Sequence, residues 1–346
     1  MQINKKRAGR VRTISGWLVA GLLMVATFAA GCGPKIDPAS KDPSKQGQDT
    51  GNKTGAKEYL FATGGTGGTY YPLGGAIANV WNQRINELHV TVQSTGASVE
   101  NMKLLGNKET ELAMAINSIA HDAYNGKGAF TKPIKNFRAV GVIYPEVIQI
   151  VTPKNSSIKS LEDLKGKRVS TGPAGSGTAV AAEQILEAYG IKLSELKVFQ
   201  DTFTDAATKL KDGNLDAAFA ILSVPAANIE DIATSKDVRI LPVTGQGLET
   251  LKRNHPFYTD YVIPANTYKG QSEDVRTVSM QAVLYAREDL PEDIVYQITK
   301  TMYEQKDEIA KGYAIGKQIS LEKALSGITV PLHSGAEKFY KEKGMK

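Results

Sequence analysis

Short apolar runs alternate with amphipathic stretches along most of the chain beyond residue 57. Each apolar run predicts a buried strand, and apolar residues at three-to-four spacing, such as Leu73, Ile77 and Trp81, predict a helix. Because strands that alternate with helices favour a mainly parallel sheet covered by helices, the pattern predicts an α/β fold. The first strands are expected at residues 58–62, 88–93 and 111–116 and within 138–151, with a helix over 98–105.

The same alternation starts again near residue 167 and predicts a second lobe. Strands are expected at residues 167–171, 196–200, 216–221 and 238–243, and helices at 178–189, 205–210 and 226–233. Thr178 is expected to cap the first of these helices. A long strand over 275–286 and a helix from Pro291, with Ile309 near its apolar face, are expected to return to the first lobe. The predicted lobes are residues 58–148 with 250–346, and residues 149–249, with a cleft between them.

The first 32 residues have the pattern of a bacterial export signal. Five basic residues precede a mostly apolar run over residues 14–30, and Gly31 precedes Cys32, the only cysteine of the chain. Ala29-Ala30-Gly31-Cys32 is similar to a lipobox, in which the cysteine thiol receives diacylglycerol. The alternative is an uncleaved transmembrane anchor, for which roughly 17 apolar residues are at the short limit. The pattern favours a signal peptide over residues 1–31 and an extracytoplasmic, membrane-anchored lipoprotein.

The formal charge of +6 reflects mainly this segment. Without residues 1–31 the chain keeps 37 basic residues (42 less five) against 36 acidic ones, so its net charge is +1. The charge therefore gives no reason to expect a nucleic-acid partner. Residues 32–57 are rich in Pro, Gly, Ser, Lys and Asp and nearly free of apolar side chains, which predicts a flexible tether.

Three turns at expected strand ends carry the candidate binding chemistry. Two are glycine-rich and open helices, where unpaired backbone N–H groups and a partial positive charge suit a carboxylate or phosphate. The remaining turn, which is the second along the chain, adds hydroxyl groups at another strand end, where open α/β sheets bind ligands. The alternative is that these residues serve only as tight turns and helix caps. The candidate residues are Gly67, Thr69 and Tyr70 in the first turn, Ser94 and Thr95 in the second, and Ser176, Gly177 and Thr178 in the third.

Signals for an enzyme are weak. The four histidines are scattered without metal-ligand spacing, and no phosphate-binding or dinucleotide-binding glycine pattern is present. Ser176 has no evident base, and Glu146 suits a cleft-lining role better than that of a general base. The sequence therefore predicts a binding protein that needs no metal and no cofactor.

Seven segments, in chain order, resemble motifs of the TAXI proteins, the solute receptors of one class of TRAP (tripartite ATP-independent periplasmic) transporters. The first reads Phe-Ala-Thr-Gly-Gly-Thr-Gly-Gly-Thr-Tyr-Tyr-Pro-Leu-Gly. The segments are residues 61–74, 94–101, 144–146, 163–169, 175–178, 212–217 and 290–296.

The resemblance implies a type II periplasmic-binding-protein fold with two α/β lobes that close on a ligand and deliver it to an ion-driven membrane permease. Ligands of this family are small carboxylates, including glutamate and related dicarboxylates. Family members often have Gln-Ser-Asp where this chain has Asn117-Ser118-Ile119, and Asn117 is still expected to contact the ligand. A monomer is expected. The alternatives are a sensor or adhesin with the same fold and, less favoured, a secreted hydrolase using Glu146 or Ser176.

Overall fold

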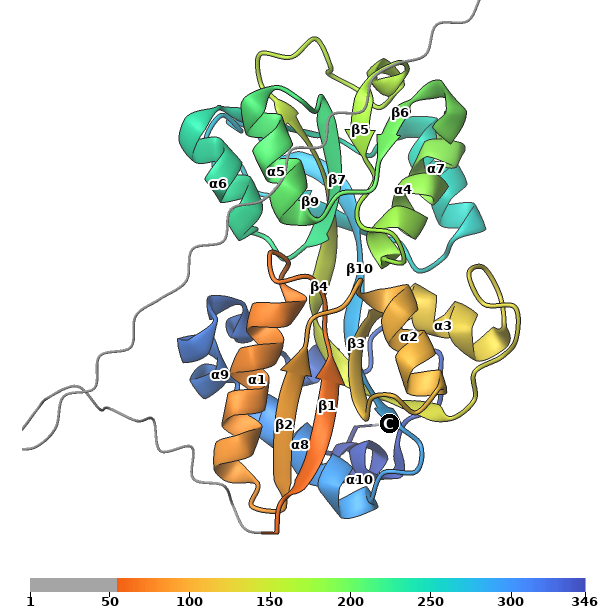
Figure 1. The fold of residues 1–346 in the computed structure, drawn as a ribbon, viewed down its shortest axis with the longest axis vertical. Helices are drawn as coiled ribbons and strands as arrows, with labels where there is room; N and C mark the ends of the chain where they lie inside the picture. The colour runs from red at the N-terminus through yellow and green to blue at the C-terminus, as the bar shows by residue number, and fades with distance from the viewer. Residues whose placement is uncertain (1–54, 346) are drawn as a thin grey trace, which may run out of the picture. The chain divides into compact units, whose positions relative to one another are not determined.

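The computed structural model describes residues 55–345 (Figure 1). The predicted signal peptide, Cys32 and nearly all of the predicted tether lie outside the described residues. Within them, ten strands form a single sheet in the order β2-β1-β3-β10-β4-β7-β5-β6, with β8 beside β4 and β9 beside β10. Helices cover the sheet, so the predicted α/β fold is confirmed. No helix in the described part of the chain is both long and apolar enough to span a membrane.

The first lobe contains three parallel strands, of which β1 lies between the other two. Its strands are β1 (Lys57–Ala62), β2 (Leu88–Gln93) and β3 (Leu112–Ile116). Its first helices are α1 (Tyr70–Arg84), α2 (Ser98–Gly106) and α3 (Asn117–Asn125). The apolar stripe of α1 is buried as predicted, with Leu73, Ile77 and Trp81 fully covered.

The second lobe repeats this arrangement around β5, which lies between β7 and β6 and is parallel to both. Its strands are β5 (Arg168–Ser170), β6 (Lys197–Phe199), β7 (Ala217–Leu222), β8 (Val238–Leu241) and β9 (Thr259–Ile263). Its helices are α4 (Gly177–Ala188), α5 (Phe203–Asp212), α6 (Ala227–Ser235) and α7 (Gly245–Asn254).

Two long antiparallel strands, β4 (Phe137–Pro153) and β10 (Val275–Arg287), run through both lobes (Figure 1). In the first lobe β10 pairs with β3, and in the second lobe β4 pairs with β7 and β8. All of these pairings are antiparallel. The predicted mainly parallel sheet is therefore wrong at its centre, where the two crossing strands make the sheet mixed.

The chain returns to the first lobe within β10 rather than at residue 250. β9 pairs with the half of β10 that lies in the second lobe. Ile263 and Tyr268 are buried in the same apolar cluster as Val147, Ala206 and other residues of the second lobe. The segment from α7 to the middle of β10 therefore belongs to the second lobe.

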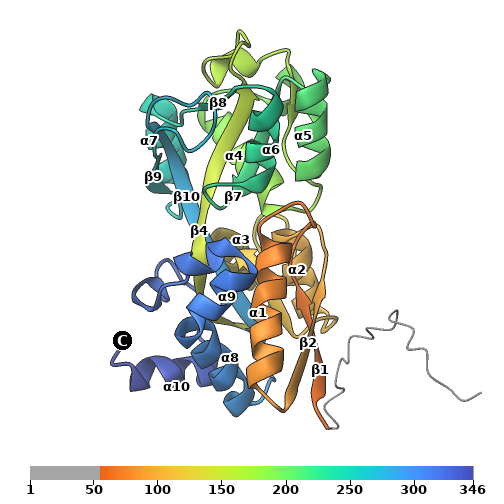
Figure 2. The same ribbon diagram turned by 90° about the vertical axis from the view of Figure 1, so that its left-hand side faces the viewer.

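The C-terminal helices complete the first lobe beside α1 (Figure 2). They are α8 (Glu292–Glu304), α9 (Lys306–Gly312) and α10 (Ser334–Glu342), with four short 3-10 turns elsewhere, among them Ala314–Gln318. The predicted helix from Pro291 thus ends at Glu304, and Ile309 lies in a second helix. Trp81 ties α1 to α8, because its Nε1–H donates to the carbonyl oxygen of Ile298 over 3.1 Å.

Candidate functional site

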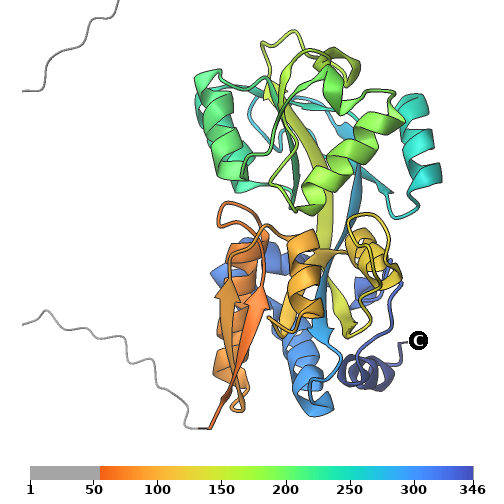
Figure 3. The same cartoon turned by 45° about the vertical axis from the view of Figure 1, so that its right-hand side comes forward.

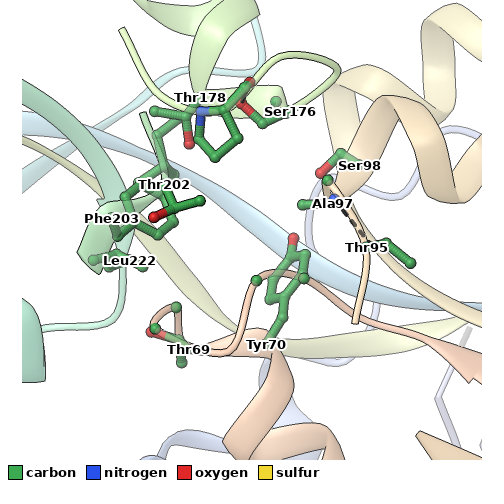
Figure 4. A pocket seen from close by; sticks show the side chains of 18 of the residues that line it. Thr69, Tyr70, Thr95, Ala97, Ser98, Ser176, Thr178, Thr202, Phe203 and Leu222 are labelled. Carbon is green, nitrogen blue, oxygen red and sulfur yellow. Dashed lines mark hydrogen bonds between the residues drawn. The ribbon is translucent and has the colours of Figure 1, made fainter. Parts of the chain in front are cut away.

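A cavity of about 450 Å³ lies between the two lobes (Figure 4). Residues 64–70 and 94–98 line it from the first lobe, and residues 176–178 and 202–204 line it from the second lobe. Ile116, Pro173, Ile221 and Leu222 add apolar surface, and Glu146 on β4 adds the one ionisable carboxyl. The three turns that the sequence singles out therefore meet at one cavity, as predicted.

Four helices begin at this cavity, two from each lobe. α1, α2, α4 and α5 start at Tyr70, Ser98, Gly177 and Phe203, and all four residues line the cavity. Figure 3 shows the opposed ends of α2 and α4, and the N–H of Glu100 donates across to the carbonyl oxygen of Gly175 over 3.3 Å. Because each helix N-terminus carries a partial positive charge, the four ends together favour a negatively charged ligand.

Among the residues that the structure describes, no lysine, arginine or histidine lines the cavity. Backbone N–H groups replace them as donors, and those of Tyr70, Ser98, Gly177 and Phe203 have no acceptor among the described residues. Such first-turn N–H groups need an external partner, which water or a ligand supplies. The cavity can therefore hold an anion without the guanidinium clamp that many carboxylate receptors use.

Ser176, rather than Thr178, caps α4. Its Oγ accepts the N–H of Ala179 over 3.0 Å and donates to the carbonyl oxygen of Pro173 over 2.6 Å. The predicted capping role of Thr178 is therefore wrong. The Thr178 hydroxyl has no hydrogen-bond partner among the described residues and lines the cavity, so it is free to contact a ligand.

Glu146 lies at the floor of the cavity, where β4 passes from one lobe to the other. It is 4% exposed, and its Oε2 accepts the hydroxyl of Tyr70 over 2.7 Å while its Oε1 accepts the hydroxyl of Tyr144 over 3.1 Å. The Tyr70 and Tyr144 rings meet edge to face, with centroids 6.3 Å apart. Burial raises the pKa of Glu146 to about 8, although both tyrosine hydroxyls act in the opposite direction. At neutral pH this carboxyl is mostly protonated and is a poor general base.

The second turn is held together by its own hydroxyl groups. Ser94 Oγ donates to the carbonyl oxygen of Gly64 over 3.0 Å. Thr95 Oγ1 donates to Asn101 Oδ1 over 2.6 Å and accepts the N–H of Ala97 over 3.0 Å. Both residues line the cavity, but their hydroxyl hydrogens serve the loop.

Asn117 is the predicted site residue that does not line the cavity. Its Nδ2 donates to the carbonyl oxygen of Gly327 over 3.0 Å, and its Oδ1 accepts the N–H of Gln281 over 3.2 Å. Its side chain joins the start of α3 to β10 and to the C-terminal part of the first lobe. The predicted ligand contact through Asn117 is therefore wrong, because both ends of its amide bind the protein backbone.

The start of α5 was not among the predicted site residues. Thr202 caps this helix through the N–H of Asp205 over 3.2 Å, and residues 202–204 line the cavity. A recognisable signal is present, because Thr202 and Asp205 form the [ST]-x-x-[DE] pattern of a helix start directly after a predicted strand.

The two lobes touch beside the cavity. Thr69 Oγ1 lies 3.1 Å from Ser223 Oγ and accepts the N–H of Ser223 over 3.2 Å. Gln318 Nε2 donates to the carbonyl oxygen of Val224 over 3.1 Å. These contacts join α1 and the C-terminal part of the first lobe to the end of β7, and they define a closed arrangement of the lobes.

Fold and site together consist of two α/β lobes and a cavity between them at which four helices of the described residues begin. Residues 61–344 match the model of the NMT1-like family, and the chain belongs to that family.

Several solved structures share this fold at low sequence identity. A protein from Bordetella bronchiseptica RB50 is 19% identical with a TM-score of 0.51, over 82% of this chain and 88% of that chain. A Listeria monocytogenes protein assigned as an L-cystine ABC transporter is 15% identical with a TM-score of 0.50, over 78% of this chain and 98% of that chain. The periplasmic aliphatic sulphonate binding protein SsuA from Escherichia coli is 15% identical with a TM-score of 0.45, over 84% of this chain and 94% of that chain.

Proposed function

We propose that this protein is the solute receptor of a TAXI-type TRAP transporter, which captures a small carboxylate between its lobes and delivers it to a membrane permease. The observation that carries the proposal is the cavity between the lobes, at which the described part of the chain places four helix N-termini and no basic side chain. A carboxylate has two oxygens that accept several hydrogen bonds, so it matches this set of donors.

The closed arrangement supports ligand capture. The cavity volume of about 450 Å³ is within the range of roughly 300 to 1,000 Å³ found for small-molecule sites. Water is displaced when two lobes close on a ligand, and hydrogen bonds to a charged group are stronger in the drier site. Gly177, Thr178 and Tyr70 are the residues we expect to hold the carboxylate, with Phe203 and Thr204 adding donors at the start of α5.

Binding fits these residues better than hydrolysis. The hydroxyl of Ser176 is engaged as a helix cap and as a donor to Pro173, and no base lies against it among the described residues. Glu146 accepts two tyrosine hydroxyls and is mostly protonated at neutral pH. Neither residue is therefore placed as an activated nucleophile or as a general base.

The proposed transporter class and the proposed lipid anchor are both inferred from the sequence. The glycine-rich motif over residues 61–74 and six further segments resemble TAXI receptors, and the NMT1-like family match spans the same part of the chain. We propose that Cys32 carries the lipid and that residues 33–57 tether the folded part to the membrane surface. A receptor anchored in this way stays close to its permease.

Thermal unfolding of the purified protein in the presence of small carboxylates tests the proposal. A binding protein is stabilised by its ligand, and the ligand is recovered chemically unchanged. Consumption of the ligand by the protein would contradict the receptor function. Loss of ligand uptake by cells that lack the protein, with uptake restored by the wild-type gene, tests the link to a permease.

A further inference from the structure

Besides the carboxylate held by the helix N-termini, the ligand carries a second functional group. The residues around Glu146, at the floor of the cavity, bear on which group this is. This inference rests on the proposed function and narrows its ligand class. We propose that the ligand is a purely anionic acid without an ammonium group, such as a dicarboxylate or an oxoacid, and that the cavity discriminates against zwitterionic amino acids.

The cavity has many more donors than free acceptors. Six lining residues at the starts of four helices have a backbone N–H without an acceptor among the described residues: Tyr70, Ser98, Gly177, Thr178, Phe203 and Thr204. The hydroxyl of Thr178 is also unpaired there. A ligand that contributes only acceptor oxygens satisfies these groups, whereas an ammonium group competes with them for space.

An ammonium group has three hydrogens and needs acceptors for them. Three of the carbonyl oxygens at lining residues already accept a hydrogen bond within the protein: that of Gly64 accepts Ser94 Oγ, that of Gly65 accepts the N–H of Gly68, and that of Pro173 accepts Ser176 Oγ. These three carbonyls thus have donors within the protein, whereas the six N–H groups at the helix starts have no acceptor among the described residues.

Glu146 is the one carboxyl that lines the cavity, and both of its oxygens are engaged. The titratable groups that face it are the hydroxyls of Tyr70 on α1 and Tyr144 on β4, and no basic or further acidic side chain within the described range 55–345 lines the cavity. Because both hydroxyls are placed to donate to this carboxyl, the hydrogen of the protonated acid is available to a ligand oxygen. A neutral acid that donates to an anion fits this environment better than an ionised acid that pairs with a cation.

The helix ends favour the same ligand class. Each N-terminus acts as roughly half a positive charge, and these act at close range within one closed cavity. An ammonium group on the ligand is repelled by them, while every added carboxylate is attracted. The electrostatic field and the hydrogen-bonding groups of the cavity therefore both favour an anionic ligand without an ammonium group.

Calorimetric titration of the purified full chain in mild detergent at pH 7 tests the inference with matched ligands. The pairs are 2-oxoglutarate against glutamate and succinate against aspartate, which differ at the carbon that carries the amino group. We expect the amino-free acid of at least one pair to bind about tenfold or more tightly than its amino counterpart, with no pair reversed. If neither amino-free acid binds more tightly than its amino counterpart, or if either pair is reversed, the inference is overturned and the receptor function stands. Failure of all four compounds to bind would overturn the inference, and only failure of every small carboxylate to bind would contradict the proposed function as well.

The Glu146→Gln variant provides a second readout, because glutamine keeps the shape of a protonated glutamic acid and can still donate a hydrogen bond. We expect its affinity for the best amino-free acid to stay within about tenfold of the wild-type value, since no ion pair is lost. A larger loss, absent from the exposed control Glu58→Gln, would show that an ionised carboxylate pairs with the ligand and would overturn the inference.

Discussion

The hydroxyl of Tyr70 donates to Oε2 of Glu146 over 2.7 Å and so joins the first residue of α1 to the strand that crosses between the lobes. Tyr70→Phe removes this buried hydrogen bond and leaves the Glu146 carboxyl with one donor fewer. We expect the free energy of unfolding to fall by about 1–3 kcal/mol, the usual cost of leaving a buried polar group without its partner. Urea denaturation measures this change. Tyr71→Phe, on the neighbouring and less buried residue, is the control and should leave stability nearly unchanged.

Ligand affinity should depend on pH through Glu146. Burial raises its pKa from 4.5 to about 8 in the folded protein, so the carboxyl ionises inside the cavity as the pH rises through 8. An anionic ligand is then repelled, and we expect its affinity to fall between about pH 7 and pH 9.5. Calorimetry across this range measures the change. Glu146→Gln should remove most of the dependence, and an affinity that rises with pH would contradict the assignment.

The raised pKa of Glu146 also makes the free energy of unfolding depend on pH. Because the pKa of Glu146 is higher in the folded protein than its value of 4.5 in an unfolded chain, the folded state binds the proton more tightly. The resulting contribution to stability is fully present below pH 4.5 and is lost as the pH rises through 8. We expect the free energy of unfolding of Glu146→Gln to decrease less than that of the wild type over this interval. Equal pH dependence of the two proteins, measured by urea denaturation without ligand, would refute this expectation.

Substitution of Ser176 should lower the stability of the protein, whereas substitution of Thr178 should lower its affinity for the ligand. Ser176→Ala removes the cap of α4 and should lower the free energy of unfolding by about 0.5–2 kcal/mol. Thr178→Val keeps the shape but removes the unpaired hydroxyl, so it should weaken ligand binding by about 1–3 kcal/mol, the range for a hydrogen bond to a charged group, with little change in stability. Calorimetry and denaturation of both variants check the two effects. Unchanged affinity in Thr178→Val would remove its hydroxyl from the site.

Gly67 lies against the second lobe, and a side chain there should oppose closure. A Cβ atom on Gly67 would lie 2.1 Å from Oγ1 of Thr204. Gly67→Ala should therefore weaken binding, and Thr204→Ala should recover part of the loss because it removes the clashing oxygen. In a double-mutant cycle the loss in the double variant should be smaller than the sum of the two single losses. Additive losses would show that the two residues do not meet in the bound state.

Thr208, on the same helix as Thr204, provides a control for Thr204→Ala. Thr208 lies one turn further along α5, is exposed and does not line the cavity. Thr208→Val should leave ligand affinity unchanged, so an effect of similar size there would point to damage to α5 rather than to lost contact across the cavity.

The strands that the sequence predicts well are short runs of buried apolar residues. β3 and β7 are examples, because all of their residues are buried and apolar and mark a strand from local sequence alone. The sequence does not reveal helix α7 because it buries a single residue, Leu251, and it does not reveal α3 because Ile119 is the one large apolar residue that this helix buries. The direction of β4 relative to β10 depends on partners more than a hundred residues apart, which local pattern does not contain.

The sequence predicts those parts of the candidate site that depend on local residue types. The glycine-rich turns that end in Tyr70 and Thr178 were found because their residue types suit helix starts, and the cavity brings them together. The choice of cap between Ser176 and Thr178 was wrong because both residues suit the role and only backbone geometry separates them. Asn117 was misplaced because its partners, Gly327 and Gln281, are distant in the sequence.

Calorimetric titration with small mono- and dicarboxylates, carried out on the wild-type protein and on Thr178→Val, shows whether this protein is a carboxylate receptor. We expect saturable binding of one carboxylate per chain, weaker binding by the variant and, by mass spectrometry afterwards, recovery of the ligand unchanged. Absence of binding by every carboxylate, or conversion of the bound compound into a product, would contradict the receptor function.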